Sequence, residues 1–268
     1  NIGTAKMALQ LPSEQLWNFY NDLGFGTPPK TGFPGEATGR LRPVKTWKPI
    51  EQATMAYGYG VSVSALQLAR AYTVFTNDGV LLPVTFVKRE SEAIGRQVIS
   101  PKTARAMAQM LETVTQTGGT ALKGQVPGYR VAGKTGTAYK LVNGQYSDHL
   151  YLSSFIGYAP ASNPRYIIAV TIDEPSAGKH AGGEVSAPVF SAVMSQALRM
   201  AGVPPDGPET QLREAVAPAP AAVAANPWKV DLNANVTMTM NTYSNNWVGG
   251  DAGSVSWASQ INGAFEKQ

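Results

Sequence analysis

One stretch of this chain constrains its fold more than any other: residues 129–142, then Asn143-Gly144, then the apolar residues 150–158. Asn-Gly between two extended segments favours a tight hairpin turn, because both residues tolerate a positive φ. Residues 150–158 and 166–172 are apolar enough to be central strands with helices packed on a face. The sequence therefore predicts an antiparallel sheet in which residues 129–142 form an edge strand.

The predicted edge strand carries Gly133-Lys134-Thr135-Gly136-Thr137-Ala138. An ammonium group and two hydroxyls in a row can hold a carboxylate. Gly136 has no side chain and lets an extended ligand lie close to the backbone. Alone, this K-T-G-T motif is weak evidence, because lysine and threonine often share an exposed strand. The sequence blocks that accompany K-T-G-T decide how the motif is interpreted.

Four sequence blocks, one of them containing K-T-G-T, occur in the order that is typical of one enzyme family. With them the chain resembles the transpeptidase domain of class B penicillin-binding proteins, most closely the cell-division type of Gram-negative bacteria, over residues 1–206. The blocks are Gly32-Phe33-Pro34-Gly35-Glu36 with Gly39; residues 57–69, running on to Tyr72 and Asn77-Asp78-Gly79; residues 131–138; and residues 155–160 through Asp173-Glu174-Pro175 to Gly182-Gly183 and Ala187-Pro188-Val189-Phe190.

The resemblance implies an α+β fold of the serine penicillin-binding protein and β-lactamase type, an antiparallel sheet with helices packed on both faces. The family's sheet has five strands. The residues support the same class, since helical periodicity and apolar strands both occur in the chain. This chain is expected to contain only the downstream part of the fold. The helical subdomain that supplies the nucleophile should be mostly missing.

The implied function is that of a peptidoglycan D,D-transpeptidase in septal cell-wall synthesis. A serine attacks the penultimate D-alanine of a stem peptide, and an amine from a neighbouring stem then resolves the acyl-enzyme. The implied partners are stem peptides ending in D-Ala-D-Ala, β-lactams and proteins of the cell-division complex. No cofactor or metal is implied. The expected location is the periplasmic face of the inner membrane, with the anchor outside this chain.

Site residues are carried over from the family position by position. Lys134 is expected to organise the charge and proton network, and the Thr137 backbone N–H to form half of the oxyanion hole. Asn1 would be the asparagine of the S-x-N motif, giving Lys134, Thr137 and Asn1 as the catalytic set. The expected substrate-binding residues are Thr135, Gly136, Thr137, Ala138, Tyr139, Gly182 and Gly183.

The same resemblance places S-x-x-K and S-x-N upstream of K-T-G. Asn1-Ile2-Gly3 matches the last residue of S-x-N and the two that follow, so the nucleophilic serine, its lysine and the serine of S-x-N are expected to be absent. Ser176-Ala177-Gly178-Lys179 fits S-x-x-K literally, yet it follows Pro175 in a glycine-containing loop instead of opening a buried helix. Ser244-Asn245-Asn246 fits S-x-N but lies in a tail unlike the family. Neither is expected to be catalytic.

Two other classes of function remain open. A class A β-lactamase needs S-x-N much closer to K-T-G than the separation of Asn1 and Lys134, and a D,D-carboxypeptidase is a related enzyme alternative. A non-catalytic interaction module of a cell-division complex would need no nucleophile. Labelling with a β-lactam separates an enzyme from a module.

Composition limits the remaining classes. The chain has 268 residues, 15% charged residues and a net charge of +4, with lysine and arginine scattered, so nucleic acid is not an expected partner. Without cysteine there is no disulfide framework or thiolate metal site. The two histidines, His149 and His180, are expected to be solvated loop residues. No apolar run is long enough for a membrane-spanning helix.

Helices are predicted from apolar periodicity and from start and stop signals. They cover residues 13–23, with Ser13 as the N-cap; residues 64–78; and residues 100–117, starting at Ser100-Pro101. A closing helix is predicted for residues 186–201, and the side chains expected to point inward are Val189, Val193, Ala197 and Met200. Residues 25–60, rich in glycine and proline, are expected to form an ordered loop region anchored by Trp47 and Tyr57.

The composition changes after residue 206. Residues 207–227 are rich in proline and alanine and are predicted to be an extended linker. Residues 228–268 contain two alternating segments, the first of them strictly alternating, that resemble the first hairpin of an outer-membrane β-barrel protein. We interpret this tail as part of another protein type, joined by gene fusion or sequence misassembly. A divergent native extension is the alternative.

Overall fold

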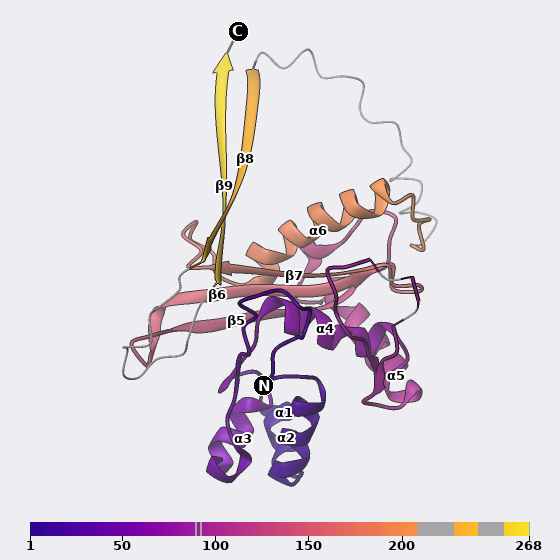
Figure 1. Cartoon of the computed structure of the whole chain (residues 1–268), viewed down its shortest axis with the longest axis vertical. Helices are drawn as coiled ribbons and strands as arrows, with labels where there is room; N and C mark the ends of the chain where they lie inside the picture. Colours follow the sequence, from indigo (N-terminus) through magenta and orange to yellow (C-terminus); the bar gives the residue numbers. More distant parts are fainter. Residues whose placement is uncertain (89, 92, 208–227, 241–254, 268) are drawn as a thin grey trace.

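The computed structural model describes residues 1–88, 90–91, 93–207, 228–240 and 255–267, with side chains up to residue 207 (Figure 1). The helices in this part are α1 Ile2–Ala8, α2 Ser13–Asp22, α3 Pro49–Met55, α4 Ala65–Thr76, α5 Pro101–Glu112 and α6 Gly182–Met200, with 3-10 turns η1 Val44–Thr46, η2 Thr113–Thr115 and η3 Leu122–Gly124. The strands are β1 Arg40–Leu41, β2 Val61–Ser62, β3 Val80–Leu81, β4 Arg96–Gln97, β5 Ala132–Val142, β6 Gln145–Ala159, β7 Tyr166–Asp173, β8 Trp228–Met240 and β9 Val255–Lys267.

The main sheet has the antiparallel order β5-β6-β7. Asn143 and Gly144 have φ values of 50° and 80° and connect β5 to β6 through the predicted tight turn, with Val142 paired to Gln145. The prediction of β5 as an edge strand is confirmed. Of the two strands predicted to be central, β6 is central and β7 lies at the other edge. Among the described residues this sheet has three strands, not the five of the family's fold.

Helices cover both faces of this sheet, which confirms the predicted α+β class (Figure 1). On one face α6 packs over Phe155 of β6, with Phe190 and Met194 in the same core cluster. On the other face α4 and α5 pack over the next residue, Ile156, together with Tyr72 of α4. Successive residues of β6 thus pack into two different hydrophobic cores, as expected for a central strand whose side chains alternate between the two faces of the sheet.

The N-terminal helices form a second, more exposed layer, with α1, α2 and α3 side by side (Figure 1). Side chain to backbone hydrogen bonds and the buried apolar residues Ala53 and Met55 of α3 both hold it together. Gln52 of α3 is buried and donates from Nε2 to the carbonyl oxygens of Ala8 (2.8 Å) and Leu11 (2.9 Å). The Tyr20 hydroxyl of α2 donates to the Met55 carbonyl at 2.6 Å. This layer is positioned by these buried residues and by a few specific polar contacts.

The C-terminal end of the domain folds back onto the sheet after α6. The Asp206 carboxylate accepts hydrogen bonds from the backbone N–H of Arg130 (2.7 Å) and from Ser162, through its backbone N–H (3.0 Å) and its hydroxyl (2.7 Å). The Tyr129 hydroxyl donates to the Val203 carbonyl at 2.6 Å, and the Gly207 N–H donates to Gly128. We call residues 203–207 the C-terminal clasp.

The predicted inward face of the last helix is wrong. Helix α6 begins at Gly182, earlier than predicted, and it buries Phe190, Met194 and Leu198. The predicted inward residues Val189, Val193 and Met200 are 42%, 49% and 79% exposed, and Ala197 is half-buried. Both stripes have helical spacing and differ by one residue, or about 100° of rotation, so periodicity alone did not separate them.

Other helix predictions need smaller corrections. Pro12 is the N-cap of α2, and Ser13 is its first helical residue. The expected loop region 25–60 contains α3, η1 and β1, and Tyr57 is exposed instead of acting as an anchor. Ser64 and Ser100 cap α4 and α5 through hydrogen bonds to the backbone three residues on. The latter confirms the predicted start at Ser100-Pro101.

The C-terminal tail contains the two predicted strands. β8 and β9 pair antiparallel as a separate two-stranded sheet, from Trp228 with Lys267 to Met240 with Val255. The predicted linker lies outside the described residues apart from Gly207, and so does Ser244-Asn245-Asn246.

Candidate active site

Strand β5 presents the K-T-G-T sequence at an open sheet edge. Lys134 pairs with Ile156 of β6 and Thr137 with Ser153, so one side of β5 is occupied by β6. Among the described strands, none pairs with its other side. An edge strand offers unpaired N–H and C=O groups that an extended peptide can use as a further strand. The geometry of β5 therefore suits a ligand in extended conformation.

The two threonine hydroxyls are both held from the protein side. The Thr137 Oγ1 accepts a hydrogen bond from the Gly182 backbone N–H at 3.1 Å. The Thr135 Oγ1 lies 2.9 Å from the Thr120 Oγ1, in the loop between η2 and η3. Because Thr137 uses its oxygen as an acceptor, its own proton remains free for a ligand.

Lys134 is exposed, and its Nζ donates to the Thr135 carbonyl oxygen at 2.9 Å. Within the described part of the chain, it forms no ion pair with a carboxylate. Lys123 and Lys179, by contrast, both bind Glu184 Oε2, at 2.7 and 2.8 Å. Hydrogen bonds from Lys123 and then Lys179 lower the pKa of the Glu184 carboxyl to about 2. Lys134 is therefore an exposed cation of the same edge strand that carries the two hydroxyls, available to an incoming anion.

Gly182 and Gly183 lie buried where α6 meets the sheet. A Cβ on Gly182 would overlap the carbonyl oxygens of Ser154 and Gly136, and one on Gly183 would overlap the Thr120 carbonyl oxygen. These glycines let the start of α6 approach the backbone closely. They therefore lie behind the site and position it; the geometry does not make them part of an exposed ligand-side wall.

An aromatic row continues the edge beyond Ala138. The Tyr139 ring lies 5.1 Å from that of Tyr151 on β6, and the Tyr151 ring stacks on His180 at 3.9 Å and 11°. The Tyr139 backbone N–H donates to the Tyr59 hydroxyl at 3.3 Å. A hydrogen bond with Tyr139, and then burial, raises the pKa of Tyr151. Sequence reasoning named Tyr139 but missed Tyr59, Tyr151 and Thr120, whose proximity depends on the tertiary fold.

Among the contacts of the described residues, those of Asn1 lie within the N-terminal layer. Asn1 is the N-cap of α1, where its carbonyl accepts the Ala5 N–H at 2.9 Å, and α1 packs on α3. Among the described residues, no hydrogen bond joins Asn1 to Lys134 or Thr137. Ser176 lies in the exposed loop before α6, and Lys179 is engaged by Glu184, so this S-x-x-K stretch lacks the buried setting of a serine–lysine nucleophile.

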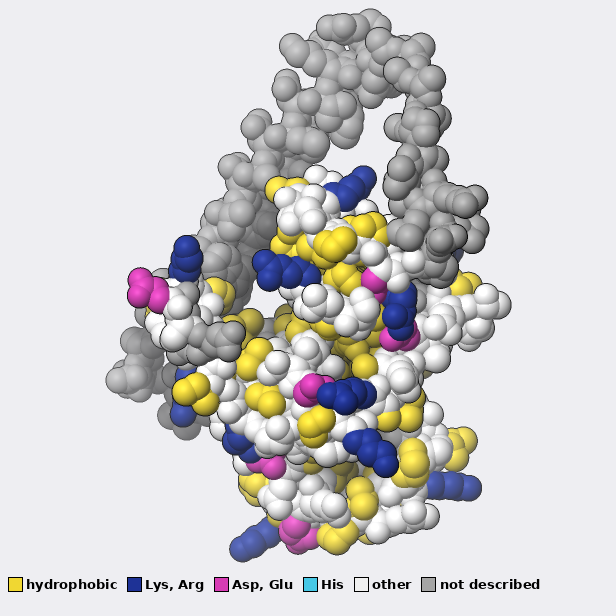
Figure 2. All heavy atoms as spheres, turned by 90° about the vertical axis from the view of Figure 1, so that its right-hand side faces the viewer, with side chains coloured by type: hydrophobic (Ala, Val, Ile, Leu, Met, Phe, Trp, Pro, Cys, Tyr) yellow, Lys and Arg dark blue, Asp and Glu magenta, His cyan; other side chains and the backbone are white. Residues whose placement is uncertain are grey.

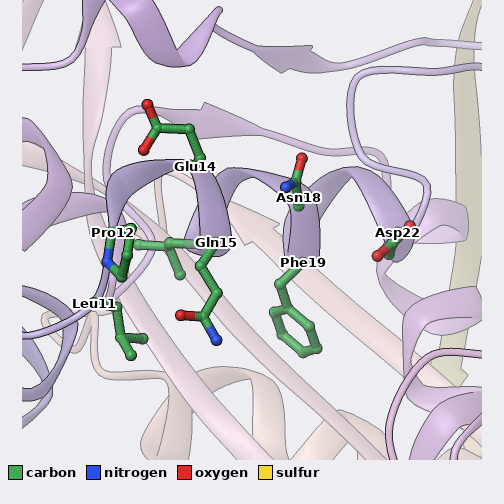
Figure 3. Close-up of a pocket in the computed structure, with 8 residues that line it drawn as sticks. Leu11, Pro12, Glu14, Gln15, Asn18, Phe19 and Asp22 are labelled. Atoms are coloured by element: carbon green, nitrogen blue, oxygen red, sulfur yellow. The ribbon is translucent and has the colours of Figure 1, made fainter.

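Three further observations concern the described chain outside this edge. A hollow of about 560 Å³ runs along α2, with Leu11, Gln15 and Phe19 on one side of the helix (Figure 3), and no residue of β5 lines it. On the face shown in Figure 2, lysine and arginine side chains are scattered, and several of them lie beside aspartate or glutamate side chains. In the part that the structure describes, no helix has the length and apolar character needed to cross a bilayer.

Comparison with known proteins agrees with this geometry. The model of the penicillin binding protein transpeptidase domain matches residues 1–195. The probable peptidoglycan D,D-transpeptidase PenA of Neisseria flavescens is 50% identical over 208 residues, 78% of this chain and 52% of that protein. The peptidoglycan D,D-transpeptidase FtsI of Escherichia coli K12 is 40% identical over 207 residues, 77% of this chain and 35% of that protein.

A solved structure gives the same result at the level of the fold. The apo transpeptidase domain of Burkholderia pseudomallei penicillin-binding protein 3 superimposes with a TM-score of 0.73 and 53% identity, covering 77% of this chain and 63% of that one. The chain spans about half or less of the length of the curated relatives named above. With K-T-G-T at an open sheet edge and a family match over residues 1–195, the chain belongs to the penicillin-binding protein transpeptidase domain family.

Proposed function

We propose that this chain forms the carboxylate-binding edge of a peptidoglycan D,D-transpeptidase. Its ligands would be stem peptides ending in D-Ala-D-Ala, and β-lactams, which mimic them. The observation that carries the proposal is an open edge strand that bears both the exposed Lys134 and two protein-held threonine hydroxyls. The relatives named peptidoglycan D,D-transpeptidase support the same reaction class.

In this proposal each residue of the edge has a separate role in binding or catalysis. The Lys134 ammonium and the hydroxyl protons of Thr135 and Thr137 hold the terminal carboxylate. Gly136 and Ala138 leave room for the extended peptide, and Tyr139 flanks it. The Thr137 backbone N–H serves the oxyanion, where losing one donor typically costs about 2.7–4 kcal/mol of barrier.

Gly182 and Gly183 act in this proposal by placing β5 and Thr120, without contacting the ligand. Asn1 is proposed as the S-x-N asparagine from its place in the sequence alone. We assign no residue of this chain as the nucleophile, because Ser176 is exposed and Lys179 is engaged by Glu184. The second candidate function, a non-catalytic module of a cell-division complex, is favoured by that same observation.

The cellular setting is also a proposal. Two relatives in sequence carry names of peptidoglycan synthesis, and the FtsI name supports a role in cell division, which we place at the septum. The corresponding location is the periplasmic face of the inner membrane, with cell-division proteins as partners. We propose residues 1–206 as the transpeptidase unit, 207–227 as the linker and 228–268 as the tail. The family match ends at residue 195 and gives the tail's barrel resemblance no support.

The test is a titration of the isotope-labelled 268-residue chain with diacetyl-L-lysyl-D-alanyl-D-alanine, followed by amide NMR shifts. Saturable shifts are expected at residues 134–138, and Lys134→Ala and Thr137→Val should each weaken binding. The matched control ligand is the same peptide with a C-terminal amide, which lacks the carboxylate. Equal affinity for peptide and amide would overturn the proposal.

Labelling with a fluorescent penicillin tests whether this chain alone can be acylated. We expect the chain by itself to form no covalent adduct on intact mass spectrometry, because Ser176 lacks an activating base in this structure. A stoichiometric adduct at Ser176 would contradict the assignment of that loop and favour an acylating enzyme over a module.

A further inference from the structure

We infer that Thr120 is a positioning residue, which donates its hydroxyl proton to Thr135 and so directs the Thr135 proton toward the ligand carboxylate. This inference rests on the proposed function, because it assumes that Thr135 meets a carboxylate. Thr120 lies outside the K-T-G-T strand, in the loop between η2 and η3, and precedes Thr135 by fifteen residues.

The first observation is the contact itself. The oxygens Oγ1 of Thr120 and Thr135 are 2.9 Å apart, within hydrogen-bond distance. A hydroxyl has one proton and two lone pairs, so either threonine could donate when the site is empty. A carboxylate only accepts. When a carboxylate binds, Thr135 donates its hydroxyl proton to that ligand. The hydrogen bond between the two threonines then requires Thr120 as the donor.

The second observation is that the backbone of Thr120 is fixed on both sides. The Thr120 carbonyl oxygen lies where a Cβ of Gly183 would be, so the start of α6 packs directly against it. On the other side, the Ala121 N–H donates to the Val114 carbonyl at 2.9 Å, and Ala121 is fully buried. A hydroxyl carried by so constrained a backbone can orient its neighbour at little entropic cost.

The third observation is the matching arrangement at Thr137. There the Gly182 N–H donates to Oγ1 at 3.1 Å and leaves the Thr137 proton free. With Thr120 donating to Thr135, both threonines of the motif would receive one hydrogen bond from the protein and offer one proton outward. Gly182 and Gly183, adjacent in α6, would then each support one of the two hydroxyls, the first directly and the second through Thr120.

The experiment uses the full 268-residue chain with Thr120→Val, which removes the hydroxyl and keeps the shape, and Thr120→Ser, which keeps the hydroxyl. Two readouts are taken. The Thr135 χ1 distribution is measured by NMR couplings without ligand, and the Kd for diacetyl-L-lysyl-D-alanyl-D-alanine is measured by titration. Thr135→Val and the double variant Thr120→Val/Thr135→Val complete a cycle that isolates the pair.

We expect Thr120→Val to broaden the Thr135 χ1 distribution and to weaken peptide binding about three- to tenfold, the value of one net hydrogen bond. Thr120→Ser should restore both readouts. The double variant should bind no more weakly than Thr135→Val, because Thr120 acts only through Thr135. A purely structural role for Thr120 would instead give additive losses in the double variant.

Three results would overturn the inference: an unchanged χ1 distribution in Thr120→Val, additive losses in the double variant, or no rescue by Thr120→Ser. If the unaltered chain fails to bind the peptide, the proposed function fails separately. The χ1 distribution in the ligand-free protein then decides whether Thr120 orients Thr135.

Discussion

The sheet with α6 and the N-terminal layer of α1, α2 and α3 are stabilised in different ways. Around the sheet, large apolar side chains such as Phe155, Phe190 and Leu198 are fully buried. In the N-terminal layer, α2 buries no residue and α1 buries only Ala8, while Ile2 and Met7 are 77% and 63% exposed. The apolar core of this layer is small, with Met55 and Ala53 of α3 buried, and the buried Gln52 side chain adds polar contacts to it.

This difference shows which region of the molecule keeps the candidate site rigid. Strand β5 and the start of α6 belong to the region with the dense core, so the hydroxyls of Thr135 and Thr137 are held by well-packed elements. Regions with few buried apolar contacts open locally at low free energy. We therefore expect the edge to keep its geometry even when the N-terminal layer opens.

The largest expected loss of stability comes from a substitution in the core under α6. Phe190→Ala removes a fully buried ring that lies 4.7 Å from Phe155, and it should cost about 3–5 kcal/mol of unfolding free energy. The neighbouring Val189→Ala is the matched control, because Val189 is 42% exposed and should cost far less. Urea unfolding of both variants measures the difference. Equal losses would contradict the observed orientation of α6.

A smaller effect is expected where α6 meets the site. Gly183→Ala places a Cβ on the Thr120 carbonyl oxygen and should destabilise the chain by up to about 3 kcal/mol through overpacking. Gly3→Ala in α1 is the control, since no atom lies near its Cβ position, and alanine should stabilise that helix slightly. Thermal unfolding checks both. A stable Gly183→Ala chain would mean that α6 can move away from the loop of Thr120.

Removing the polar contact of the N-terminal layer should have a local effect. Gln52→Ala loses both hydrogen bonds to the Ala8 and Leu11 carbonyls and leaves these acceptors unpaired, at about 1–3 kcal/mol. Hydrogen exchange should accelerate in α1 while β5–β7 stay protected. Gln15→Ala on the exposed side of α2 serves as the control. Faster exchange throughout the sheet would show that the two regions unfold as one unit.

The smallest effect is expected from the tail. Deleting residues 208–268 retains the clasp and should leave the thermal midpoint unchanged within about 2 °C, a few tenths of a kcal/mol. Deleting residues 203–268 also removes the hydrogen bonds of Asp206 and the Val203 carbonyl, and should lower the midpoint clearly. If both deletions lowered it equally, the boundary at residue 206 would be misplaced.

Much of the sheet region could be predicted from the sequence, because its signals are local. The Asn143-Gly144 turn, the apolar strands and the cap at Ser100 each depend on neighbouring residues. The register beyond the turn did not follow from the turn alone. An irregularity between Tyr139 and Leu141 shifts the pairing, so that Tyr139 faces Tyr151, and this places the aromatic row.

The parts that were missed depend on contacts between distant segments. Helix α3 lies in a glycine- and proline-rich stretch, and its Gln52 is buried because Ala8 and Leu11 lie beside it. The rotation of α6 is fixed by the contact of Gly182 and Gly183 with β5, β6 and the loop of Thr120. The roles proposed for Lys134, Thr135 and Thr137 came from the resemblance, and those expectations stay predictions until ligand binding is measured.

The C-terminal clasp has a mechanical consequence. A pull applied to the chain beyond Gly207 first meets the hydrogen bonds that join Asp206 to Arg130 and Ser162, and Gly207 to Gly128. Several short bonds loaded together share the force, so α6 and the packing beneath the site are shielded from it. Tension on whatever follows residue 207 would therefore be borne at the far end of α6, and the K-T-G-T edge of β5 would keep its shape under load.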